Sequence, residues 1–443
     1  MHTADRSDLN RWRVIKFGGS SVANPACWPH IAKTVQTALD EGARLLVVVS
    51  ALRGITDLLA AQTSAETAQP AGRVLEEVRR RHIDLAAQLG LTDSGLDDSL
   101  AALRHCLDKA DLGENPAAQA ELMAQGELLS SRLAVVLLDH FGLQSNWLDA
   151  REVLRCPEDP NRSPASEYLS AHCPAAPNRQ LQARLAETDR CHVMPGFLAA
   201  NSRAETVLLG RGGSDTSASC AAAVLEAERV EIHSDVPGLF SADPRRIPGA
   251  RLLKMVSYRE AQELAAMGAK ALHPRSLIPV TQYRIPLWLR QVDRPDMEGT
   301  RISPQARDHG AQVKAIVQRK GMTLVALEGI GMWQQVGFLA DIFTEFKTLG
   351  LSVDQVSTSE SNVTVTLDPG ANVTDQATLR ELRRRLERHC RVEILTDCAT
   401  ISLVGLGIRT ILHRLGPALE VFEQRRIFQV SQAANDLNLT FVV

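Results

Sequence analysis

A run of nine residues, Ala43 to Ala51, reads ARLLVVVSA and consists almost entirely of apolar side chains, with three valines in a row. A strand with one face in water alternates apolar and polar residues, whereas a nearly continuous apolar run is typical of a central parallel strand covered on both faces. The segments CHVMPGF and RVEIHSDV, from Cys191 and Arg229, have the same character. These runs predict a layered α/β fold around a buried parallel sheet.

Helical patterns separate the predicted strands over roughly 300 residues. Residues 13–17 form the first predicted strand, and helices are expected at residues 28–39, 75–89, 100–107 and 121–138. Residues 156–178 contain five prolines and are expected to form a loop.

The pattern changes near residue 300 and then repeats. The segments that begin at Thr323 and Thr400 each read strand, glycine turn, amphipathic helix, strand, short turn, strand. A basic helix at residues 374–389 and a strand at residues 391–395 lie between them. This predicts two copies of a small βαββαβ module. The second copy stops at Val443, where the first continues, so we expect it to be incomplete.

Bulk properties exclude several classes of protein. A length of 443 residues predicts two or three domains. A formal net charge of -3 gives no basic footprint for nucleic acid or a membrane surface. Neither a spanning run of about 18 apolar residues nor a signal peptide is visible. The eight cysteines form no CxxC pair, which favours reduced thiols in a cytoplasmic protein.

The first motif, KFGGSS, follows the opening strand at Lys16. Gly18 and Gly19 allow backbone N–H groups to approach an anion closely, and Lys16 adds a point charge suited to a phosphoryl group. A plain tight turn is the alternative interpretation.

The second motif, GRGGSDTSA, follows a short strand and opens an alanine-rich helix. Arg211, Ser214 and Asp215 offer a cation, a hydroxyl and a carboxylate at that point. An ordinary N-capped helix would explain Ser214 and Asp215 but does not require Arg-Gly-Gly, so we favour a site.

Two later motifs add charged residues. SDVPGLFSADPR places Asp235 and Arg245 after a strand, where open α/β sheets bind ligands, although a polar surface turn also fits. MGAKALHPRS supplies a second cation, Lys270. His273 in the same motif is interpreted as structural, because the sequence suggests no nucleophile to partner it.

These four motifs, in this order, resemble the signatures of the aspartate kinase family. LMAQGELLSSRL resembles the family's helix with a glycine–glutamate pair, and VVVSALRGITDLL resembles its second strand and loop. The repeated tail resembles the paired ACT modules that follow the kinase domain. The resemblance covers essentially the whole chain.

The resemblance implies a three-layer α/β/α amino-acid kinase domain at residues 1–300, followed by two ferredoxin-like ACT modules. The first module with its linker would span residues 301–396, and the second residues 397–443.

The implied reaction transfers the γ-phosphoryl group of ATP to the β-carboxylate of L-aspartate. Lys16 and Lys270 would stabilise the phosphoryl group, and Asp215 would hold Lys16. Mg²⁺ would bridge the phosphates mostly through water, without a cage of protein ligands. The implied ATP-binding residues are Lys16, Gly18, Gly19, Ser20, Asp235, Phe240, Arg245 and Lys270. The implied aspartate-binding residues are Ser50, Thr56, Glu127, Arg211 and Ser214.

Two positions depart from the family pattern. Ser20 stands where Thr is usual, which keeps the hydroxyl. Phe240 stands where Tyr is frequent, which removes a hydroxyl but keeps an aromatic ring.

The resemblance also implies feedback inhibition by an amino acid at the first ACT module, with Asp354 as partner for its ammonium group. Lysine is the expected effector. Inhibition by threonine, or by lysine and threonine together, is the alternative, because Gln335 stands where lysine-sensitive enzymes often carry Ser. The implied pocket residues are Met332, Gln335, Gly337, Phe338, Leu339, Val353 and Asp354. A homodimer or higher homo-oligomer through the ACT modules is expected.

Three further expectations concern function. The stop at Val443 suggests the leading half of a fusion with homoserine dehydrogenase or diaminopimelate decarboxylase. A kinase of the same fold acting on glutamate or UMP is an alternative, which the repeated tail and Glu127 disfavour. A catalytically silent amino-acid sensor is another, which intact Lys16, Arg211, Asp215 and Lys270 disfavour.

Overall fold

The computed structural model describes residues 11–109, 111–160, 162–188, 190–269, 271–304, 310–329, 336–414, 416–432 and 434–443. The chain forms two compact units. Unit 1 comprises Met1–Leu239, Leu252–Gln262 and Lys270–Ala306, and unit 2 comprises Phe240–Arg251, Glu263–Ala269 and Arg307–Val443.

Unit 1 is built on an eight-stranded sheet with the order β3-β4-β2-β1-β7-β9-β10-β8. Adjacent strands of this sheet run parallel from β3 to β9. The strands β9 and β10 are antiparallel, and β10 and β8 are again parallel. The predicted parallel sheet is therefore confirmed. The strands are β1 (Trp12–Phe17), β2 (Arg44–Val49), β3 (Asn146–Trp147), β4 (Cys191–Pro195), β7 (Arg229–Ser234), β8 (Met255–Val256), β9 (Leu287–Gln291) and β10 (Thr300–Ile302). A separate hairpin joins β5 (Leu198–Ala200) to β6 (Thr206–Leu208).

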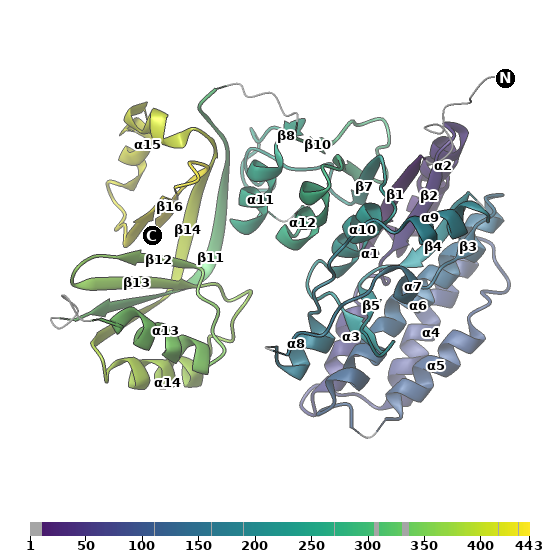
Figure 1. The fold of residues 1–443 in the computed structure, drawn as a ribbon, viewed down its shortest axis with the longest axis horizontal. Coiled ribbons are helices and arrows are strands. Elements are labelled where there is room, and N and C mark those ends of the chain that lie inside the picture. The colour runs from purple at the N-terminus through teal and green to yellow at the C-terminus, as the bar shows by residue number, and fades with distance from the viewer. Residues whose placement is uncertain are drawn as a thin grey trace. The chain divides into compact units, whose positions relative to one another are not determined.

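Helices cover both faces of this sheet (Figure 1). Ile15 and Phe17 of β1 belong to the core that includes α2, α4, α5 and α6. Val14 and Lys16 point to the opposite face, because strand side chains alternate, and there Lys16 meets α10. The helices are α1 (Gly19–Val22), α2 (Trp28–Asp40), α3 (Ile55–Ala60), α4 (Ala71–Gln88), α5 (Asp97–Leu107), α6 (Pro116–His140), α7 (Ala150–Val153), α8 (Pro164–Leu169), α9 (Arg179–Ala186), α10 (Gly213–Val224) and α12 (Pro274–Gln282). The helix α11 (Tyr258–Ala266) continues from unit 1 into unit 2.

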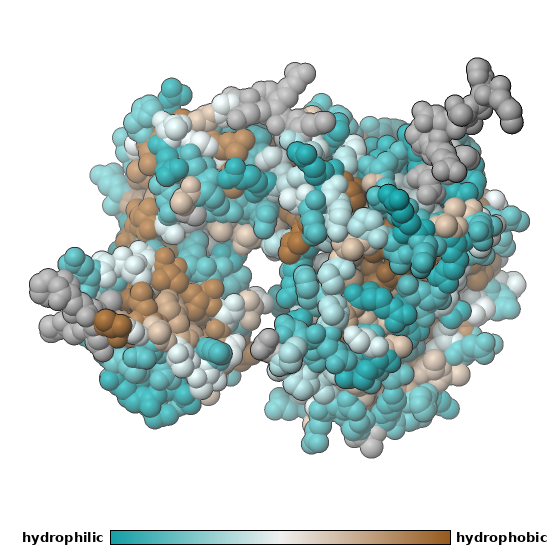
Figure 2. Space-filling model, viewed as in Figure 1, coloured by the Kyte–Doolittle hydropathy of each residue, from teal (hydrophilic) through white to brown (hydrophobic). Residues whose placement is uncertain are grey.

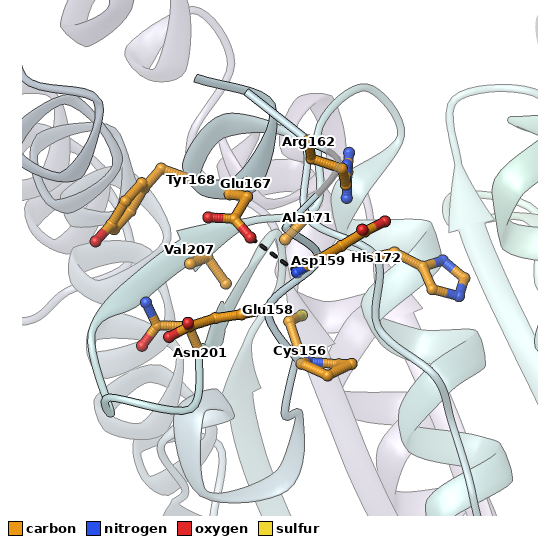
Figure 3. A pocket seen from close by; sticks show the side chains of 11 residues that line it. Cys156, Glu158, Asp159, Arg162, Glu167, Tyr168, Ala171, His172, Asn201 and Val207 are labelled. Carbon is orange, nitrogen blue, oxygen red and sulfur yellow. Dashed lines mark hydrogen bonds between the residues drawn. The ribbon is translucent and has the colours of Figure 1, made fainter. Parts of the chain in front are cut away.

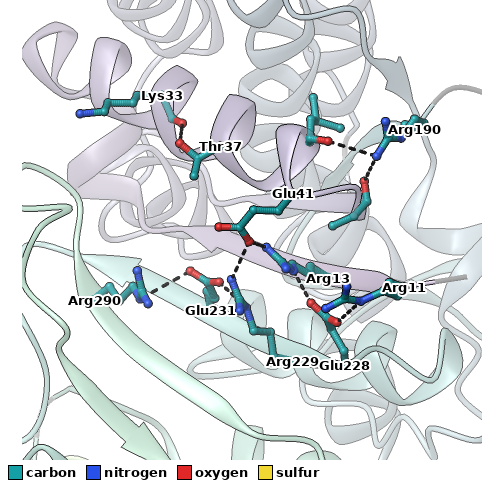
Figure 4. A network of polar contacts seen from close by, with 12 residues as sticks. Arg11, Arg13, Lys33, Thr37, Glu41, Arg190, Glu228, Arg229, Glu231 and Arg290 are labelled. Carbon is teal, nitrogen blue, oxygen red and sulfur yellow. Dashed lines mark hydrogen bonds and ion pairs between the residues drawn. The ribbon is translucent and has the colours of Figure 1, made fainter. Parts of the chain in front are cut away.

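A charged network fixes β7 in this sheet (Figure 4). Glu231, which is 3% exposed, accepts a hydrogen bond from Arg229 Nε at 2.7 Å and lies 3.2 Å from His233 Nε2. Arg290 Nε on β9 lies 3.6 Å from the same carboxylate. Burial by itself raises the pKa of Glu231, but His233 and the two arginines outweigh it and lower that pKa to about 2.

Unit 2 contains a six-stranded antiparallel sheet with the order β12-β13-β11-β14-β16-β15. Its strands are β11 (Gln312–Glu328), β12 (Gln355–Thr358), β13 (Asn362–Leu367), β14 (Arg391–Leu406), β15 (Gln429–Ser431) and β16 (Asn438–Val442). The long strands β11 and β14 serve both copies of the predicted repeat. Residues 323–328 of β11 pair with β13 in the first copy, and residues 312–320 pair with β14 beside the second. The predicted pair of modules is therefore confirmed, with one shared sheet.

The helices of the first copy form its core. Residues of α13 (Phe338–Thr348) and α14 (Gln376–Leu386) pack on β11 and β13, and Ile342, Phe346, Leu382 and Leu386 are almost fully buried. Apolar residues also gather at the surface over β12 and β13, where Val356 is 39% exposed (Figure 2).

Two predicted elements differ from the structure. The single amphipathic helix expected in the second copy is instead three short pieces, η3 (Ile408–Arg414), α15 (Gly416–Leu419) and η4 (Glu420–Phe422). Gly416 has little helix propensity and Pro417 lacks an N–H donor, so the pair interrupts a continuous helix. The predicted loop at residues 156–178 contains the short helix α8, where Ser163 Oγ accepts a hydrogen bond from Ser166 N–H.

Among the helices of the described residues, none is both long enough and apolar enough to cross a membrane.

Candidate active site

The candidate site lies at the carboxyl ends of the parallel strands of unit 1. Lys16 is the penultimate residue of β1, which lies between β2 and β7. The chain places β2 and β4 on one side of β1 and later places β7 and β9 on the other. In open α/β sheets, ligands bind outside the carboxyl ends of the strands at such a change of direction.

A lysine and an aspartate from distant parts of the chain meet at this point. Lys16 Nζ lies 2.5 Å from Asp215 Oδ1, and the two side chains are 10% and 16% exposed. Asp215 belongs to the first turn of α10, after Gly212 in the left-handed conformation at φ 64°. A Cβ at Gly212 would come within 2.3 Å of His273 Cβ, so only glycine fits this turn. The predicted partnership of Lys16 with Asp215 has its expected geometry.

The glycine loop after β1 is fixed on both sides. Gly18 N–H donates to the His233 carbonyl at 3.0 Å, and Arg53 N–H donates to the Gly19 carbonyl at 3.2 Å. A Cβ at Gly19 would lie 2.5 Å from the Ala51 carbonyl oxygen. Gly19 is therefore required by the close approach of the loops that follow β1 and β2.

Glu127 is a buried carboxylate beside these loops. It lies on α6 with 3% exposure, and its carboxylate accepts a hydrogen bond from Ala51 N–H. Burial raises the pKa of Glu127 to about 8, against the hydrogen bond and the positive charge of Lys16. Glu127 Oε2 has no hydrogen-bond partner in the described part of the chain. An unpaired buried carboxylate is costly, so this group suits a cationic ligand.

The predicted hydroxyl residues occupy three different elements. Ser50 is buried directly after β2, and its carbonyl accepts a hydrogen bond from Ser130 Oγ at 2.7 Å. Thr56 is half-buried in α3. Ser214 is half-buried in α10, where it contacts Gly196 so closely that a Cβ at Gly196 would lie 2.7 Å away.

Arg211 is exposed between two glycines of positive φ, Gly210 and Gly212. It forms no hydrogen bond or ion pair with any other residue that the structure describes. His273 caps α12, since its Nδ1 accepts a hydrogen bond from Arg275 N–H at 3.3 Å. The structural interpretation of His273 is thus supported, and Arg211 remains available to an anion.

Phe197 was not identified from the sequence. It follows β4 with a left-handed φ of 72°, which is rare for an aromatic residue, and it lies against Gly213. Its N–H donates to Ser217 Oγ at 2.9 Å. Strained backbone of this kind gathers at functional sites, but no sequence pattern reveals a positive φ at a non-glycine residue.

The predicted nucleotide-binding residues are divided between the units. Asp235 is exposed directly after β7 in unit 1. Phe240 and Arg245 belong to unit 2, where Arg245 Nε lies 3.2 Å from Asp243 Oδ1 at the surface. Lys270 lies outside the described residues.

The predicted effector residues lie in the first copy of unit 2, and two of them, Met332 and Gln335, fall outside the described residues. Gly337 has a φ of 90° at the start of α13. Phe338 is buried in the core of the copy, and Leu339 is exposed. Asp354 follows Val353 and is already paired with Arg319 at 2.5 Å.

A hollow in unit 1 lies around Cys156 and His172 (Figure 3). It contains none of the residues Lys16, Glu127 or Asp215. Much of its polar lining is paired locally, since Glu167 accepts from Asp159 N–H at 2.9 Å and Glu158 pairs with Arg203 at 3.0 Å. No cluster of three or more His, Cys, Asp or Glu side chains suited to a metal ion occurs among the described residues.

The chain belongs to the amino acid kinase family, whose model matches residues 11–291. Within that family it is one of the aspartokinases. It is 32% identical over 440 residues to the lysine-sensitive aspartokinase 3 of Escherichia coli, covering 97% of this chain and 95% of the relative.

Solved structures agree with this relationship. The structure of E. coli aspartokinase III in complex with aspartate and ADP has a TM-score of 0.82 and 30% identity, covering 98% of this chain and 96% of that one. Its complex with lysine and aspartate has a TM-score of 0.78 and 30% identity, covering 97% and 95%. A bifunctional aspartokinase/homoserine dehydrogenase of Haemophilus influenzae is 31% identical over 421 residues, which cover 90% of this chain and 50% of the relative.

Proposed function

We propose that this protein transfers the γ-phosphoryl group of ATP to the β-carboxylate of L-aspartate, yielding 4-phospho-L-aspartate for the synthesis of lysine, threonine and methionine. The observation that carries the proposal is the Lys16–Asp215 pair beside the unpaired carboxylate of Glu127, at the carboxyl edge of the sheet. The similar E. coli enzyme was crystallised with aspartate and ADP, which supports the same substrate pair.

Lys16 and Lys270 stabilise the charge on the phosphoryl group during transfer. Asp215 positions Lys16, because the ion pair holds the ammonium group at the end of β1 rather than in solvent. Phosphoryl transfer depends mainly on positioning and charge stabilisation, so no covalent intermediate with the protein is required.

Three features suit the acceptor amino acid. Arg211, with no partner among the described residues, grips a substrate carboxylate with two parallel hydrogen bonds. Glu127 receives the α-ammonium group, which supplies the cation that its buried oxygen lacks. Ser50, Thr56 and Ser214 add polar contacts.

For the nucleotide, Gly19 and Ser20 donate backbone N–H groups to phosphate oxygens. Gly18 shapes the loop beside the phosphates instead, because its own N–H is donated to the His233 carbonyl at 3.0 Å. Asp235, Phe240 and Arg245 contact the nucleoside and phosphate. Mg²⁺ would be held by the phosphates and by water rather than by protein side chains. Asp215 is paired with Lys16, and the described residues form no metal cluster. When bound, Mg²⁺ neutralises phosphate charge.

Regulation is proposed to occur in the first copy of unit 2. An effector amino acid, lysine in the first instance and threonine as the alternative, places its ammonium group on Asp354. Met332, Gln335, Gly337, Phe338, Leu339 and Val353 complete the pocket. The E. coli relative is lysine-sensitive by name and was crystallised with lysine, which favours lysine.

We further propose the organisation of the chain and its surroundings. The kinase domain comprises residues 1–300, and the ACT modules comprise residues 301–396 and 397–443. Exposed Val356 and Val430 give the module sheet apolar surface suited to a homo-oligomer. We propose a cytoplasmic location and, because some relatives are bifunctional, a fused second enzyme.

The test is a coupled assay of ADP release with L-aspartate, L-glutamate and UMP as acceptors, each with and without lysine and threonine. Activity with aspartate alone, reduced by lysine, is the expected result. A higher rate with glutamate or UMP would mean that aspartate is not the acceptor. If no phosphoryl group is transferred but an amino acid still binds, the catalytically silent sensor is favoured.

A further inference from the structure

Arg319 on β11 is half-buried and lies against two carboxylates of unit 2. Its Nη2 lies 2.5 Å from Asp354 Oδ2, and its Nη1 lies 2.8 Å from Asp368 Oδ2. The Arg319 side chain is only 13% exposed. Arg319 therefore occupies the carboxylate that the proposed effector would use for its ammonium group.

The aliphatic part of Arg319 packs on Gly268 in the same unit. A Cβ at Gly268 would lie 2.6 Å from Arg319 Cγ and 2.9 Å from its Cδ, and Gly268 has a φ of +106°. Only glycine permits this contact without displacing Arg319. Gly268 stands two residues before Lys270 in the chain.

The rest of that segment is attached to the second copy. Met267 Sδ accepts a hydrogen bond from Ser402 Oγ at 3.3 Å, and Glu263 Oε1 accepts one from Asn438 Nδ2. The residues directly before Lys270 are thus bound to the regulatory sheet. Arg319 contacts both this segment and Asp354.

We propose that Arg319 is the positioning residue that couples effector binding to catalysis. The effector's ammonium group replaces the Arg319 guanidinium on Asp354, so the carboxylate exchanges one cation for another. Arg319 keeps its ion pair with Asp368, but its side chain shifts away from Asp354. Its packing on Gly268 therefore changes, two residues before Lys270 in the chain. An effector shifts such an equilibrium only by its differential affinity for the two arrangements. The inference rests on the proposed function of Asp354 as the effector's partner.

The experiment compares lysine binding with lysine inhibition in the full chain. Binding is measured by calorimetry, and inhibition by the steady-state rate at saturating lysine. Arg319→Gln removes the internal competitor, so we expect lysine to bind about 5-fold more tightly or better, while maximal inhibition falls well below that of the parent. Arg388→Gln is the matched control, because Arg388 pairs with Glu345 at 2.9 Å at the surface of the same copy and should alter neither quantity.

Two results would overturn the role of Arg319. If binding and inhibition in Arg319→Gln both match the parent, or both weaken in proportion, Arg319 is not the coupling residue. Should that variant not fold, Arg319→Lys serves instead. It keeps the Cγ and Cδ that pack on Gly268 and a cation beside Asp354, but its single ammonium nitrogen cannot pair with Asp354 and Asp368 through separate nitrogens as the guanidinium does. Weaker maximal inhibition is therefore expected, and parental inhibition refutes the proposal. Normal lysine binding by Asp354→Asn would instead refute the effector site itself.

Discussion

Lys16 Nζ and Asp215 Oδ1 lie 2.5 Å apart, although 198 positions of the chain separate these residues. The strand β1 presents Lys16 at the edge of the sheet, and the first turn of α10 presents Asp215 on the same face. The pair fixes an ammonium group at the point where the topology leaves room for a ligand. The first prediction concerns its effect on the reaction.

Replacing Lys16 with Met should lower kcat by about 100- to 1000-fold, because a preorganised charge in an enclosed site contributes about 3–4 kcal/mol to the transition state. Lys33→Met on the exposed face of α2 is the control and should leave kcat unchanged. Steady-state rates with saturating ATP and aspartate decide the matter. A parental kcat in Lys16→Met would remove this residue from the mechanism.

The raised pKa of Glu127 predicts a pH dependence of aspartate binding. Below about pH 8 the unliganded carboxyl is largely protonated, and it must lose that proton to pair with an ammonium group. The KM for aspartate should therefore fall as the pH rises from 6 to 8. Glu127→Gln should raise KM and abolish this dependence, whereas a parental pH profile in that variant would exclude Glu127 from the aspartate site.

The same group affects stability with a definite sign. Between the ordinary pKa of a glutamate, near 4.3, and the folded value of about 8, the folded protein holds a proton that the unfolded chain does not. The free energy of unfolding should therefore fall with rising pH, by at most about 1.4 kcal/mol per pH unit from this residue. Urea denaturation of the unliganded protein at several pH values measures the slope, and Glu127→Gln should make it less negative.

Glu231 should contribute to stability in the opposite sense. Its pKa is lowered to about 2, so its stabilisation is present above the unfolded pKa and is lost as the pH falls toward 2. Glu231→Gln leaves Arg229 and Arg290 without their buried partner and should cost about 3–5 kcal/mol at pH 7. Glu77→Gln, which breaks surface pairs with Arg80 and Arg81, should cost much less, because water screens exposed ion pairs. Equal losses in the two variants would contradict this account.

The close approach at Gly19 predicts a steric effect on activity. Gly19→Ala places a Cβ 2.5 Å from the Ala51 carbonyl and should separate the two loops, with a rise in the KM for ATP of about tenfold or more. Gly72→Ala in α4 meets no atom within 4 Å and should leave KM unchanged. An unaltered KM in Gly19→Ala would show that the loop tolerates the shift.

The sequence by itself determined the elements and the identity of the polar residues. The valine-rich run predicted β2, and the repeat after Thr323 predicted both modules, because hydrophobic periodicity reports local burial. The four motifs nominated Lys16, Arg211 and Asp215, and the resemblance of LMAQGELLSSRL to the family's helix nominated Glu127. The short pieces between Ile408 and Phe422 were missed, because apolar spacing alone does not show where Gly-Pro interrupts a helix.

Only the tertiary structure decided at what distance these residues meet and in what state. The pairing of Lys16 with Asp215, the raised pKa of Glu127 and the left-handed Phe197 all depend on elements that are distant in the chain. The contact of Arg319 with both Asp354 and Gly268 is of the same kind. Periodicity and spacing describe neighbours along the chain, whereas desolvation and charge pairing depend on neighbours in space.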